Sequence, residues 1–494
     1  MSGTDPKIVE EVTLNWTDLT GKKTGATALG SNKFYKAQIL DLGGGAYRVV
    51  FNYGRVGQAG QTQAVPAASL AQAQSLMNKK VKEKTDKGYT KLDMRSEADE
   101  KAKAAAKGVT VTPDAPKQKA VRTKTFHPEV ENLVKLLYGS TGAAVAAGLS
   151  SSAGATKDAP LGNLSDTQLD KGADILEKCE QFATGKKKAT KNDFVDLTNE
   201  YLSNIPRNID FARKRGKLDL DAILLNSPER IEAQRKFITL LRDASLQKEV
   251  FAKAAEYDDP VEVWYDGLKC DVEFAPADSD FYKMVKKLFD TGQSPKNSNF
   301  HGQVKLYRVW KCEQQGAKQP FEDYAATVVG KPNATGRTWA WHGTRTENMM
   351  GICKMGLRMP QNLPKGVHIT GKTFGLGIYH TPCWEDSGKD RKDAKGKTYQ
   401  RHNGALKSMN YTSLRGAYYG DGNTADRGYM FLEELALGVP EIQHDVCWNK
   451  PAPDPGCDYI FAESWGHKSL ANDEVVTFHE SASRRVAIVE VGYK

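Results

Sequence analysis

The 494-residue chain contains no apolar run that approaches the ~20 residues needed to cross a bilayer. Residues 1–6 also lack the basic and apolar blocks of a secretory signal peptide. Neither a membrane-spanning segment nor a secretory signal is therefore expected. We expect an intracellular, soluble protein with no membrane partner.

Cysteine is scarce, with seven residues in the chain, and no two of them form a Cys-x-x-Cys pair. Local pairs of this kind build zinc ribbons and fingers, and closely spaced cysteines build disulfide frameworks. We therefore expect reduced, mostly buried thiols, no zinc finger and no metal cofactor. The cysteines are Cys179, Cys270, Cys312, Cys353, Cys383, Cys447 and Cys457.

Bulky apolar residues are nearly absent from residues 97–125, where Lys and Arg alternate with Ala, Pro and Thr. Such a segment cannot bury a core and is typical of a basic, flexible linker. The whole chain carries a formal charge of +9, which is compatible with a polyanion partner. Charge alone does not distinguish a nucleic-acid contact from a solvated basic surface, and both readings stay open.

The length predicts two to four domains, and the first of them is expected over residues 1–96. Alternation places Tyr47, Val49, Phe51 and Tyr53 on one face of a strand. A second strand is expected over residues 34–40, with the three glycines 43–45 as the turn and a helix over 67–84. This pattern indicates a small domain of one sheet and one helix.

Residues 126–250 have helical periodicity and are expected to form an all-α bundle. Val130, Leu133, Val134 and Leu137 follow the i, i+3, i+4, i+7 spacing. Ser165 with Gln168 has the capping-box pattern, and Ser227-Pro228 places a cap residue before a proline at the first helical position.

Strand patterns return over residues 251–494, as in 304–310, 429–437, 475–478 and 486–491. Glycine- and proline-rich connections separate them, which predicts a mixed α+β domain. The expected fold class is therefore multidomain α+β.

Residues 366–373 match the phosphate-binding pattern G-x-x-x-x-G-K-T. That pattern binds phosphate only between a buried strand and the N-terminus of a helix. Prolines at 360 and 364 argue against the strand, and Phe374-Gly375-Leu376-Gly377 does not begin a helix. We reject a nucleotide triphosphatase on these grounds.

Three separated segments contain His342, Tyr379 and Glu474. Taken alone, each residue fits ordinary core packing or a solvated strand edge. Taken in this order, the three segments resemble the His-Tyr-Glu signature of poly(ADP-ribose) polymerases. They are Trp341–Arg345, Phe374–Tyr379 and Asn472–Val476.

The resemblance extends over nearly the whole chain. Lys407–Tyr411 resembles the Lys-Ser-x-Asn-Tyr segment of that family, and Pro160–Gly162 with Leu202–Pro206 resembles its regulatory helical domain. Tyr53-Gly54-Arg55, after Asn32–Lys36, is similar to the Trp-Gly-Arg motif of its WGR module, with tyrosine in place of tryptophan. No segment matches the family's zinc fingers or BRCT domain.

The resemblance implies how NAD would be bound as a substrate. His342 would hydrogen-bond a ribose hydroxyl, and the Gly343 backbone with the Ser408 hydroxyl would hold the nicotinamide carboxamide. Tyr379 and Tyr411 would stack on the two faces of the nicotinamide ring.

The resemblance also implies the catalytic residues, which are His342, Tyr379 and Glu474. Glu474 would bond the 2′-hydroxyl of the nicotinamide ribose, stabilise the forming cation and polarise the acceptor hydroxyl. Asn348 and Arg358 match positions on the adenosine and pyrophosphate side. A glutamate at the place of Glu474 favours elongation of a polymer.

The WGR module implies binding of DNA strand breaks through Asn32, Tyr53 and Arg55. The helical domain would obstruct NAD until DNA loosens it, which is an order–disorder switch. Residues 382–406 form a charged insertion relative to the family. It could cover the acceptor entrance, bind nucleic acid or remain a solvated loop.

The resulting expectation is a DNA-break-activated poly(ADP-ribose) polymerase in DNA repair, with protein acceptors that include the enzyme itself. The alternatives are a mono-ADP-ribosyltransferase, an NAD-hydrolysing enzyme, or a catalytically silent scaffold that binds DNA ends. The expected location is the nucleus in a eukaryote and the cytoplasm or nucleoid in a bacterium. The expected domains are 1–96 (WGR), 97–125 (linker), 126–250 (regulatory) and 251–494 (catalytic).

Overall fold

The computed structural model describes most of the chain. The described residues are 6–21, 30–94, 121–153, 164–209, 212–214, 217–254, 256–297, 299–365, 371–392, 396–401, 403–414, 425–465 and 470–494. Most of the expected linker (95–120) and the motif Pro160–Gly162 lie outside them. No helix in the described part of the chain has both the length and the apolar character needed to span a bilayer.

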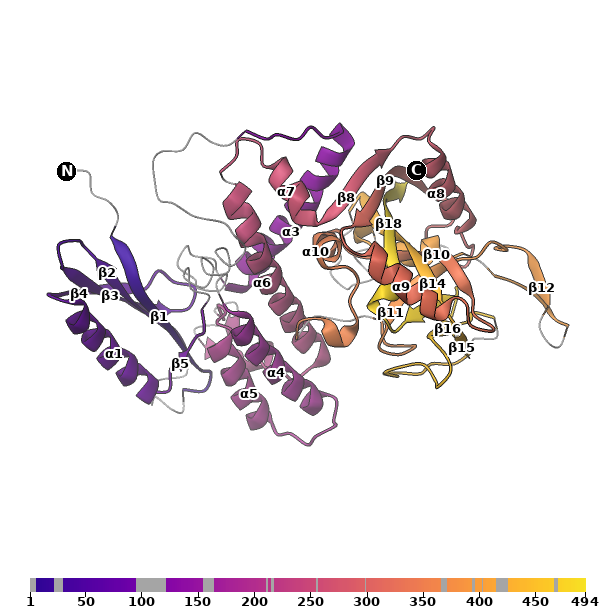
Figure 1. The fold of residues 1–494 in the computed structure, drawn as a ribbon. Coiled ribbons are helices and arrows are strands. Elements are labelled where there is room, and N and C mark those ends of the chain that lie inside the picture. The colour runs from indigo at the N-terminus through magenta and orange to yellow at the C-terminus, as the bar shows by residue number, and fades with distance from the viewer. Residues whose placement is uncertain are drawn as a thin grey trace. The chain divides into compact units, whose positions relative to one another are not determined.

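The chain divides into two compact units (Figure 1). The first unit contains Met1–Lys117, Ala143–Lys248 and Pro364–His368, and the second contains Gln118–Gly142, Glu249–Leu363 and Ile369–Lys494.

The first unit begins with a five-stranded antiparallel sheet of order β4-β3-β2-β1-β5. Its core includes Val49 and Phe51 of β3, and Met77 of the single helix α1. The helix begins after Ser69, whose side chain accepts a hydrogen bond from the backbone N–H of Gln72. The elements are β1 (Lys7–Asp18), β2 (Ser31–Asp41), β3 (Tyr47–Arg55), β4 (Gln61–Ala67), α1 (Leu70–Asp86) and β5 (Thr90–Lys91).

The sheet-plus-helix expectation for the first domain is confirmed. Glycines 43–45 all have positive φ, a region that glycine adopts without steric cost, and they make the turn between β2 and β3.

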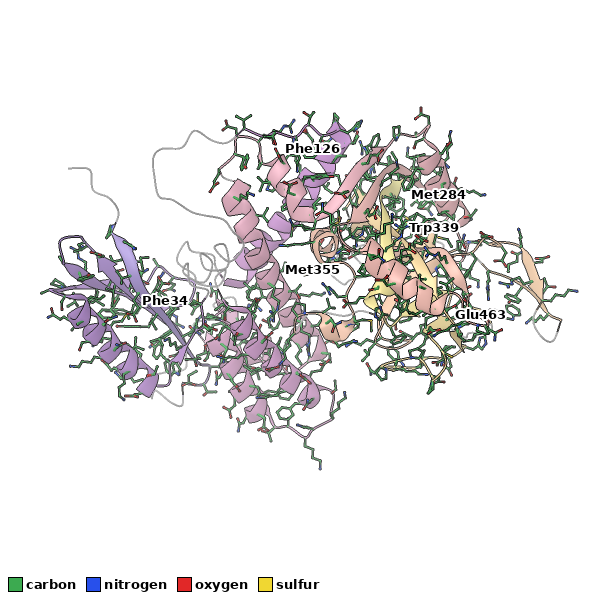
Figure 2. All side chains as sticks on the ribbon, viewed as in Figure 1. Phe34, Phe126, Met284, Trp339, Met355 and Glu463 are labelled. Atoms are coloured by element: carbon green, nitrogen blue, oxygen red, sulfur yellow. The ribbon has the colours of Figure 1, made fainter. Side chains whose placement is uncertain are left out.

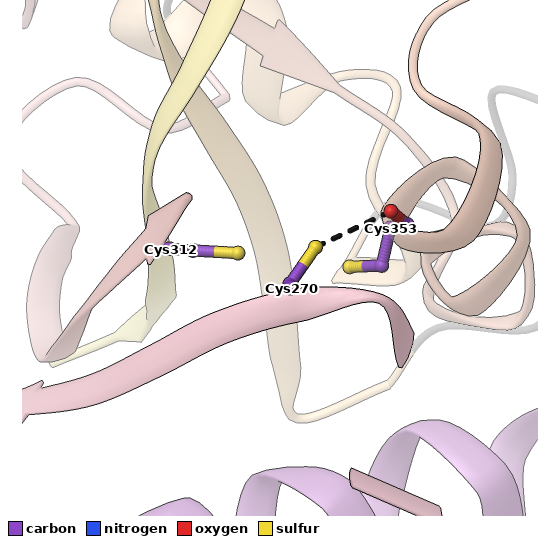
Figure 3. Close-up of side chains that lie close together, drawn as sticks. All are labelled: Cys270, Cys312 and Cys353. Carbon is purple, nitrogen blue, oxygen red and sulfur yellow. Dashed lines mark hydrogen bonds between the residues drawn. The ribbon is translucent and has the colours of Figure 1, made fainter. Parts of the chain in front are cut away.

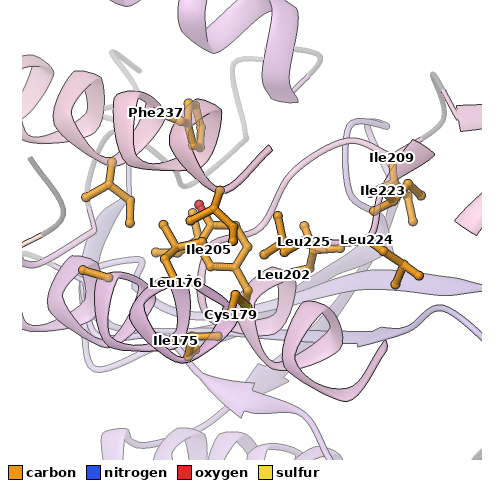
Figure 4. Close-up of a cluster of buried hydrophobic side chains, with 14 of the residues drawn as sticks. Ile175, Leu176, Cys179, Leu202, Ile205, Ile209, Ile223, Leu224, Leu225 and Phe237 are labelled. Atoms are coloured by element: carbon orange, nitrogen blue, oxygen red, sulfur yellow. The ribbon is translucent and has the colours of Figure 1, made fainter. Parts of the chain in front are cut away.

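The first unit continues with helices around a second apolar core (Figure 4). This core includes Leu176 of α4, Leu202 of α5 and Ile238 of α6. The elements are α4 (Asp166–Ala183), α5 (Lys191–Asn204), β6 (Arg213–Lys214), β7 (Lys217–Leu218), η3 (Leu220–Ala222) and α6 (Pro228–Ala254).

The predicted cap at Ser165 is present, since its side chain accepts from the backbone N–H of Gln168. The return bond of a capping box is not made by Gln168. Its amide bonds instead to Asp93 and Asn204, so the capping-box pattern was half correct.

Helix α3 (Pro128–Ala153) is shared between the two units. Its first turns carry Val130, Leu133, Val134 and Leu137, which lie in the core of the second unit with Trp310 and Phe431. The helical periodicity there is confirmed. The residues it buries, however, pack on the sheet of the second unit rather than in the helical core around Leu176.

The second unit is built on a nine-stranded sheet of order β15-β16-β17-β11-β10-β14-β18-β9-β8. All neighbouring strands are antiparallel except β15 and β16, which are parallel. The strands are β8 (Cys270–Ala275), β9 (Val304–Gln314), β10 (Gly336–Gly343), β11 (Ile378–Cys383), β14 (Arg427–Leu437), β15 (Pro440–Gln443), β16 (Tyr459–Ala462), β17 (Glu474–Thr477) and β18 (Ser483–Tyr493).

This sheet is covered on both faces. Met430 and Leu432 of β14 lie in one core with residues of α8 and α11. Tyr429 and Phe431 lie in the opposite core with residues of α7 and α10. Because alternate residues of a strand point to opposite faces, a strand buried on both sides is apolar along most of its length. The helices are α7 (Val261–Leu268), α8 (Asp280–Thr291), α9 (Lys318–Val328), α10 (Thr346–Met355), η4 (Pro360–Asn362), α11 (Ala405–Met409) and η6 (Glu480–Ala482).

Figure 2 draws the side chains on the ribbon and labels two of them at the border of these cores. Met284 of α8 and Trp339 of β10 are partly buried against the first core. The charged insertion forms a small antiparallel ribbon of β12 (Asp390–Lys392) and β13 (Thr398–Gln400).

Candidate active site

Three neighbouring strands bring His342, Tyr379 and Glu474 together. The sheet order β17-β11-β10 places the strand of Tyr379 between the strands of the other two. Tyr379 pairs with Val476 of β17, and Trp341 of β10 pairs with Thr381 of β11. The segments that the sequence separates by tens of residues are therefore adjacent in the fold.

His342 is held by a hydrogen bond from its ring Nδ1 to the carbonyl oxygen of Tyr379 at 2.9 Å. A carbonyl oxygen can only accept, so Nδ1 carries the proton and Nε2 is left as an acceptor. Burial lowers the pKa of His342 to about 4. The ring is therefore neutral at pH 7, and Nε2 can accept a hydrogen bond from a hydroxyl group.

This pKa predicts a pH dependence of stability. The unfolded histidine binds a proton below about pH 6.5, whereas the folded one stays neutral down to about pH 4. The contribution of the neutral His342 ring to the free energy of unfolding is therefore complete above pH 6.5, and it decreases as the pH falls through this window. Between pH 7.5 and pH 5, the free energy of unfolding of the wild type should decrease by about 2 kcal/mol more than that of His342→Gln. Denaturant unfolding at both pH values measures the difference, and equal losses in the two proteins would contradict the assigned pKa.

Gly343 ends β10 against helix α11. A Cβ at this position would lie 1.8 Å from the carbonyl oxygen of Ser408, which no side chain can occupy. The Ser408 hydroxyl is buried, lies 2.6 Å from Thr381 Oγ1 and donates to the carbonyl oxygen of Trp341 at 3.1 Å. The strand and the helix are thus locked together at this point.

Tyr379 is fixed at its hydroxyl. The oxygen accepts from the backbone N–H of Phe374 at 2.8 Å and donates to the carbonyl oxygen of Gly375 at 2.9 Å. Burial raises the pKa of Tyr379, whereas the hydrogen bond from the backbone of Phe374 acts in the opposite direction.

Glu474 begins β17, and its Oε1 lies 3.0 Å from Nζ of Lys407. The preceding residue, Asp473, accepts from Trp384 Nε1 at 3.0 Å and from the backbone and hydroxyl of Ser464 at 2.9 and 2.8 Å. Asp473 therefore fixes the start of the strand that presents Glu474.

The two residues expected on the adenosine side lie on exposed surface. Asn348 is on α10, with its amide 3.5 Å from Thr344 Oγ1. Arg358 donates to Glu480 at 2.7 Å, and Glu480 also accepts from Asn362. In order to bind a phosphate, Arg358 would have to release Glu480 or bind the carboxylate and the phosphate together.

The three predicted DNA contacts differ in accessibility. Asn32 is buried, where its Oδ1 accepts from Thr17 at 3.1 Å and its Nδ2 donates to the carbonyl oxygen of Arg207 at 2.5 Å. Tyr53 stacks on Tyr35 with ring centroids 5.7 Å apart, and Arg55 donates to Gly30 at 3.5 Å. Tyr53 and Arg55 are partly exposed. Asn32 holds the sheet to the helical segment, and its role toward DNA stays a prediction.

The rejected phosphate-binding pattern lies partly outside the described residues, which resume at 371. From there the chain turns directly into strand β11, and no helix follows the motif. A helix N-terminus for a phosphate is therefore missing at this point of the described chain.

Three family models match the chain, in order. They are "WGR domain" over residues 11–96, "Poly(ADP-ribose) polymerase, regulatory domain" over 124–265 and "Poly(ADP-ribose) polymerase catalytic domain" over 279–459. The chain belongs to the poly(ADP-ribose) polymerase family. The family and fold class expected from the sequence are confirmed.

Two relatives show how much of this polymerase-family chain aligns with known proteins. "Poly [ADP-ribose] polymerase 2" of Zea mays is 26% identical over 373 residues, which are 72% of this chain and 52% of that protein. "Protein mono-ADP-ribosyltransferase PARP3" of Homo sapiens is 25% identical over 464 residues, 88% of this chain and 74% of that protein. The chain thus spans about half the length of the maize relative.

The catalytic-domain match includes His342, Tyr379, Ser408 and Tyr411 but ends at residue 459, before Glu474. The position of Glu474 beside Tyr379 therefore rests on the pairing of β17 with β11. Sequence reasoning did not assign a role to Lys407, Thr381 or Asp473. Lys407 stood within the quoted Lys-Ser segment, whereas nothing local marks Thr381 or Asp473.

Proposed function

We propose that this poly(ADP-ribose) polymerase-family chain is an NAD-dependent ADP-ribosyltransferase. It would release nicotinamide and transfer ADP-ribose to protein acceptors, itself included. The observation that supports this best is the placement of His342, Tyr379 and Glu474 on the neighbouring strands β10, β11 and β17.

The reaction breaks the glycosidic bond to nicotinamide through a transition state with oxocarbenium character. Nε2 of His342 would accept from a ribose hydroxyl, because Nδ1 is already used as a donor. The backbone of Gly343 and the hydroxyl of Ser408 would hold the carboxamide. Tyr379 and Tyr411 would stack on the nicotinamide ring.

Glu474 would place negative charge near the forming cation and polarise the acceptor hydroxyl. The ammonium of Lys407, 3.0 Å away, pairs with this carboxylate and holds it in place. A carboxylate that can activate a ribose hydroxyl supports polymer elongation.

A second candidate is transfer of single ADP-ribose units. It is favoured by the similarity to a relative named as a mono-ADP-ribosyltransferase, which this chain matches over 464 residues. Gel electrophoresis after incubation with labelled NAD distinguishes the two. Polymer gives a smear above the protein, and single transfers give sharp bands.

DNA strand breaks are the proposed activator, bound by the WGR module through Tyr53 and Arg55. Both side chains are partly exposed, and a guanidinium suits a phosphate. The test of the proposed function is labelled NAD turnover with and without nicked DNA. We expect turnover that rises with DNA, whereas DNA binding without any turnover would leave a catalytically silent scaffold.

Helices α4 and α6 hold a segment that leads to the active site. Arg242 of α6 donates to Asp166 and Asp170 of α4 and to the carbonyl oxygen of Lys365 at 3.1 Å. The ammonium of Lys365 lies 2.9 Å from Asp174 of α4. Six residues later, Gly371 lies against the ring of Tyr379, since a Cβ there would be 2.8 Å from Tyr379 Cδ2.

We propose that these contacts restrain the segment until DNA binding loosens the helices. Removing them should therefore raise the activity measured without DNA. The ion pair of Asp174 with Lys365 is exposed and worth at most ~1 kcal/mol, so Asp174→Ala should raise basal activity by about two- to fivefold. Arg242→Ala, which removes three bonds, should raise it further.

Asp196→Ala is the matched control, because Asp196 is an exposed aspartate on the neighbouring helix α5. Basal NAD turnover is the readout, with the DNA-stimulated rate as the reference. An unchanged basal rate in both Asp174→Ala and Arg242→Ala would refute the restraint. Point substitutions are preferable to deletion of residues 127–250, because α3 supplies Val130 and Leu133 to the core of the second unit.

A further inference from the structure

Three cysteines that are far apart in the sequence meet inside the second unit (Figure 3). Cys270 begins β8, Cys312 lies in β9 and Cys353 lies in α10. Their three sulfur atoms all lie within 4.8 Å of one another. None of the three residues is more than 1% exposed.

The register of the two strands explains how two of the sulfurs meet. Cys312 pairs with Val272, and Cys270 pairs with Gln314, so the two cysteines are diagonal neighbours on one face. Helix α10 brings Cys353 onto the same face, where its carbonyl oxygen lies 3.2 Å from the sulfur of Cys270. The cluster therefore joins two strands and a helix.

A buried positive charge stands beside the cluster. Nη1 of Arg485 lies 3.8 Å from the sulfur of Cys270, and Arg485 is 1% exposed. Its Nε is 3.5 Å from Glu433, and no described residue accepts a hydrogen bond from it. A fixed guanidinium next to sulfur favours a thiolate over a thiol.

A disulfide between Cys270 and Cys312 is a poor account of this arrangement. Diagonal neighbours on antiparallel strands have Cα atoms roughly 7–8 Å apart, whereas disulfides need about 4.4–6.8 Å. A disulfide would also leave the third sulfur without a partner. The convergence of all three sulfurs at one point is instead typical of ligands around an ion.

We propose that Cys270, Cys312 and Cys353 form a buried structural site for a thiophilic cation, either Zn²⁺ or Cu⁺. Thiolates select these ions over Mg²⁺ and Ca²⁺. In a tetrahedral thiolate site with metal–sulfur bonds of ~2.3 Å, the sulfurs are ~3.8 Å apart. The observed separations reach this geometry with shifts of about an ångström.

Metal ligands bind as thiolates, so binding of the ion would release thiol protons of the cluster to solvent. Arg485 would then act from outside the ligand set as a donor to the thiolate of Cys270. The bound ion would fasten α10 to strands β8 and β9. Since α10 follows His342 and Gly343 directly and carries Asn348, the ion would also fix one side of the proposed NAD site.

The first test is metal content. The full chain is purified without chelators from cells supplied with zinc, and separately after anaerobic loading with Cu⁺, and metal is measured by mass spectrometry. We expect about one ion per chain for one of the two metals and about a tenfold or greater loss in Cys312→Ser. Cys383→Ser, a buried cysteine of the same unit outside the cluster, should retain the ion.

The second test does not depend on a variant that folds. X-ray absorption of the wild-type chain should show sulfur ligands at ~2.3 Å, and calorimetry should show that protons are released when the ion binds. A wild-type chain that takes up neither metal overturns the proposal. So do ligands that are nitrogen and oxygen alone, an ion retained by Cys312→Ser, or a disulfide within the cluster.

Discussion

Glu474→Gln is expected to lower polymer elongation by about 10²- to 10³-fold, whereas nicotinamide release should fall by about tenfold. The amide of glutamine can still hydrogen-bond the ribose hydroxyl, which preserves part of the binding. It cannot accept a proton from the acceptor hydroxyl, so elongation loses its base. Labelled NAD gives both rates, from free nicotinamide and from polymer length.

The neighbouring lysine provides the control for this substitution. Glu474→Gln removes the carboxylate that pairs with Lys407, so the double variant Glu474→Gln/Lys407→Gln tests whether the remaining ammonium causes the loss. Glu322→Gln, a partly exposed glutamate of α9 paired with Arg337, controls for the chemical change itself. Equal loss of cleavage and elongation in Glu474→Gln would contradict the assigned role.

Gly343→Ala is expected to abolish NAD turnover and to destabilise the second unit by about 3 kcal/mol or more. The added Cβ would lie 1.8 Å from the carbonyl oxygen of Ser408. That oxygen belongs to the backbone of α11 and cannot rotate away as a side chain would. The helix would have to move, and Ser408 and Tyr411 would move with it.

Gly351→Ala is the matched control, because nothing lies within 4 Å of a Cβ at that position on α10. It should be neutral or stabilising by ~1 kcal/mol, as for other helical glycines. Thermal unfolding and binding of nicotinamide are the measurements. Unchanged values in Gly343→Ala would show that the strand and α11 are not locked together.

Strand faces and helix caps could be predicted from the sequence, because the residues that form them are close together in the chain. Alternation marked Val49 and Phe51, which lie in the core of the first sheet. The serine before α4 was identified because its cap bonds to a residue three positions later. The partner of the Gln168 side chain was not visible, because it bonds to Asp93 and Asn204.

The order of strands could not be predicted in the same way, because alternation carries no information about which strand is the neighbour. Family order suggested that His342, Tyr379 and Glu474 belong together, but their adjacency depends on the order β17-β11-β10. Asn32 illustrates the same limit. Its bond to Arg207 joins residues 175 positions apart. A comparison of the short motif around Asn32 cannot show such a distant partner.

Prediction of a metal site from cysteine spacing likewise depends on cysteines that are close together in the sequence. Cys270, Cys312 and Cys353 are separated by about forty residues each, so no spacing rule marks them. Their sulfurs meet because β8 pairs with β9 and α10 packs on the same face.

The two bonds at the hydroxyl of Tyr379 have a consequence for the energetics of NAD recognition. A tyrosine that is free to rotate loses conformational entropy each time a ligand orders it, at a cost of ~0.5–1.5 kcal/mol. Here Phe374 and Gly375 immobilise the phenol from both sides. The ordering therefore occurs once, during folding, and the ring offers the ligand a surface that is already rigid.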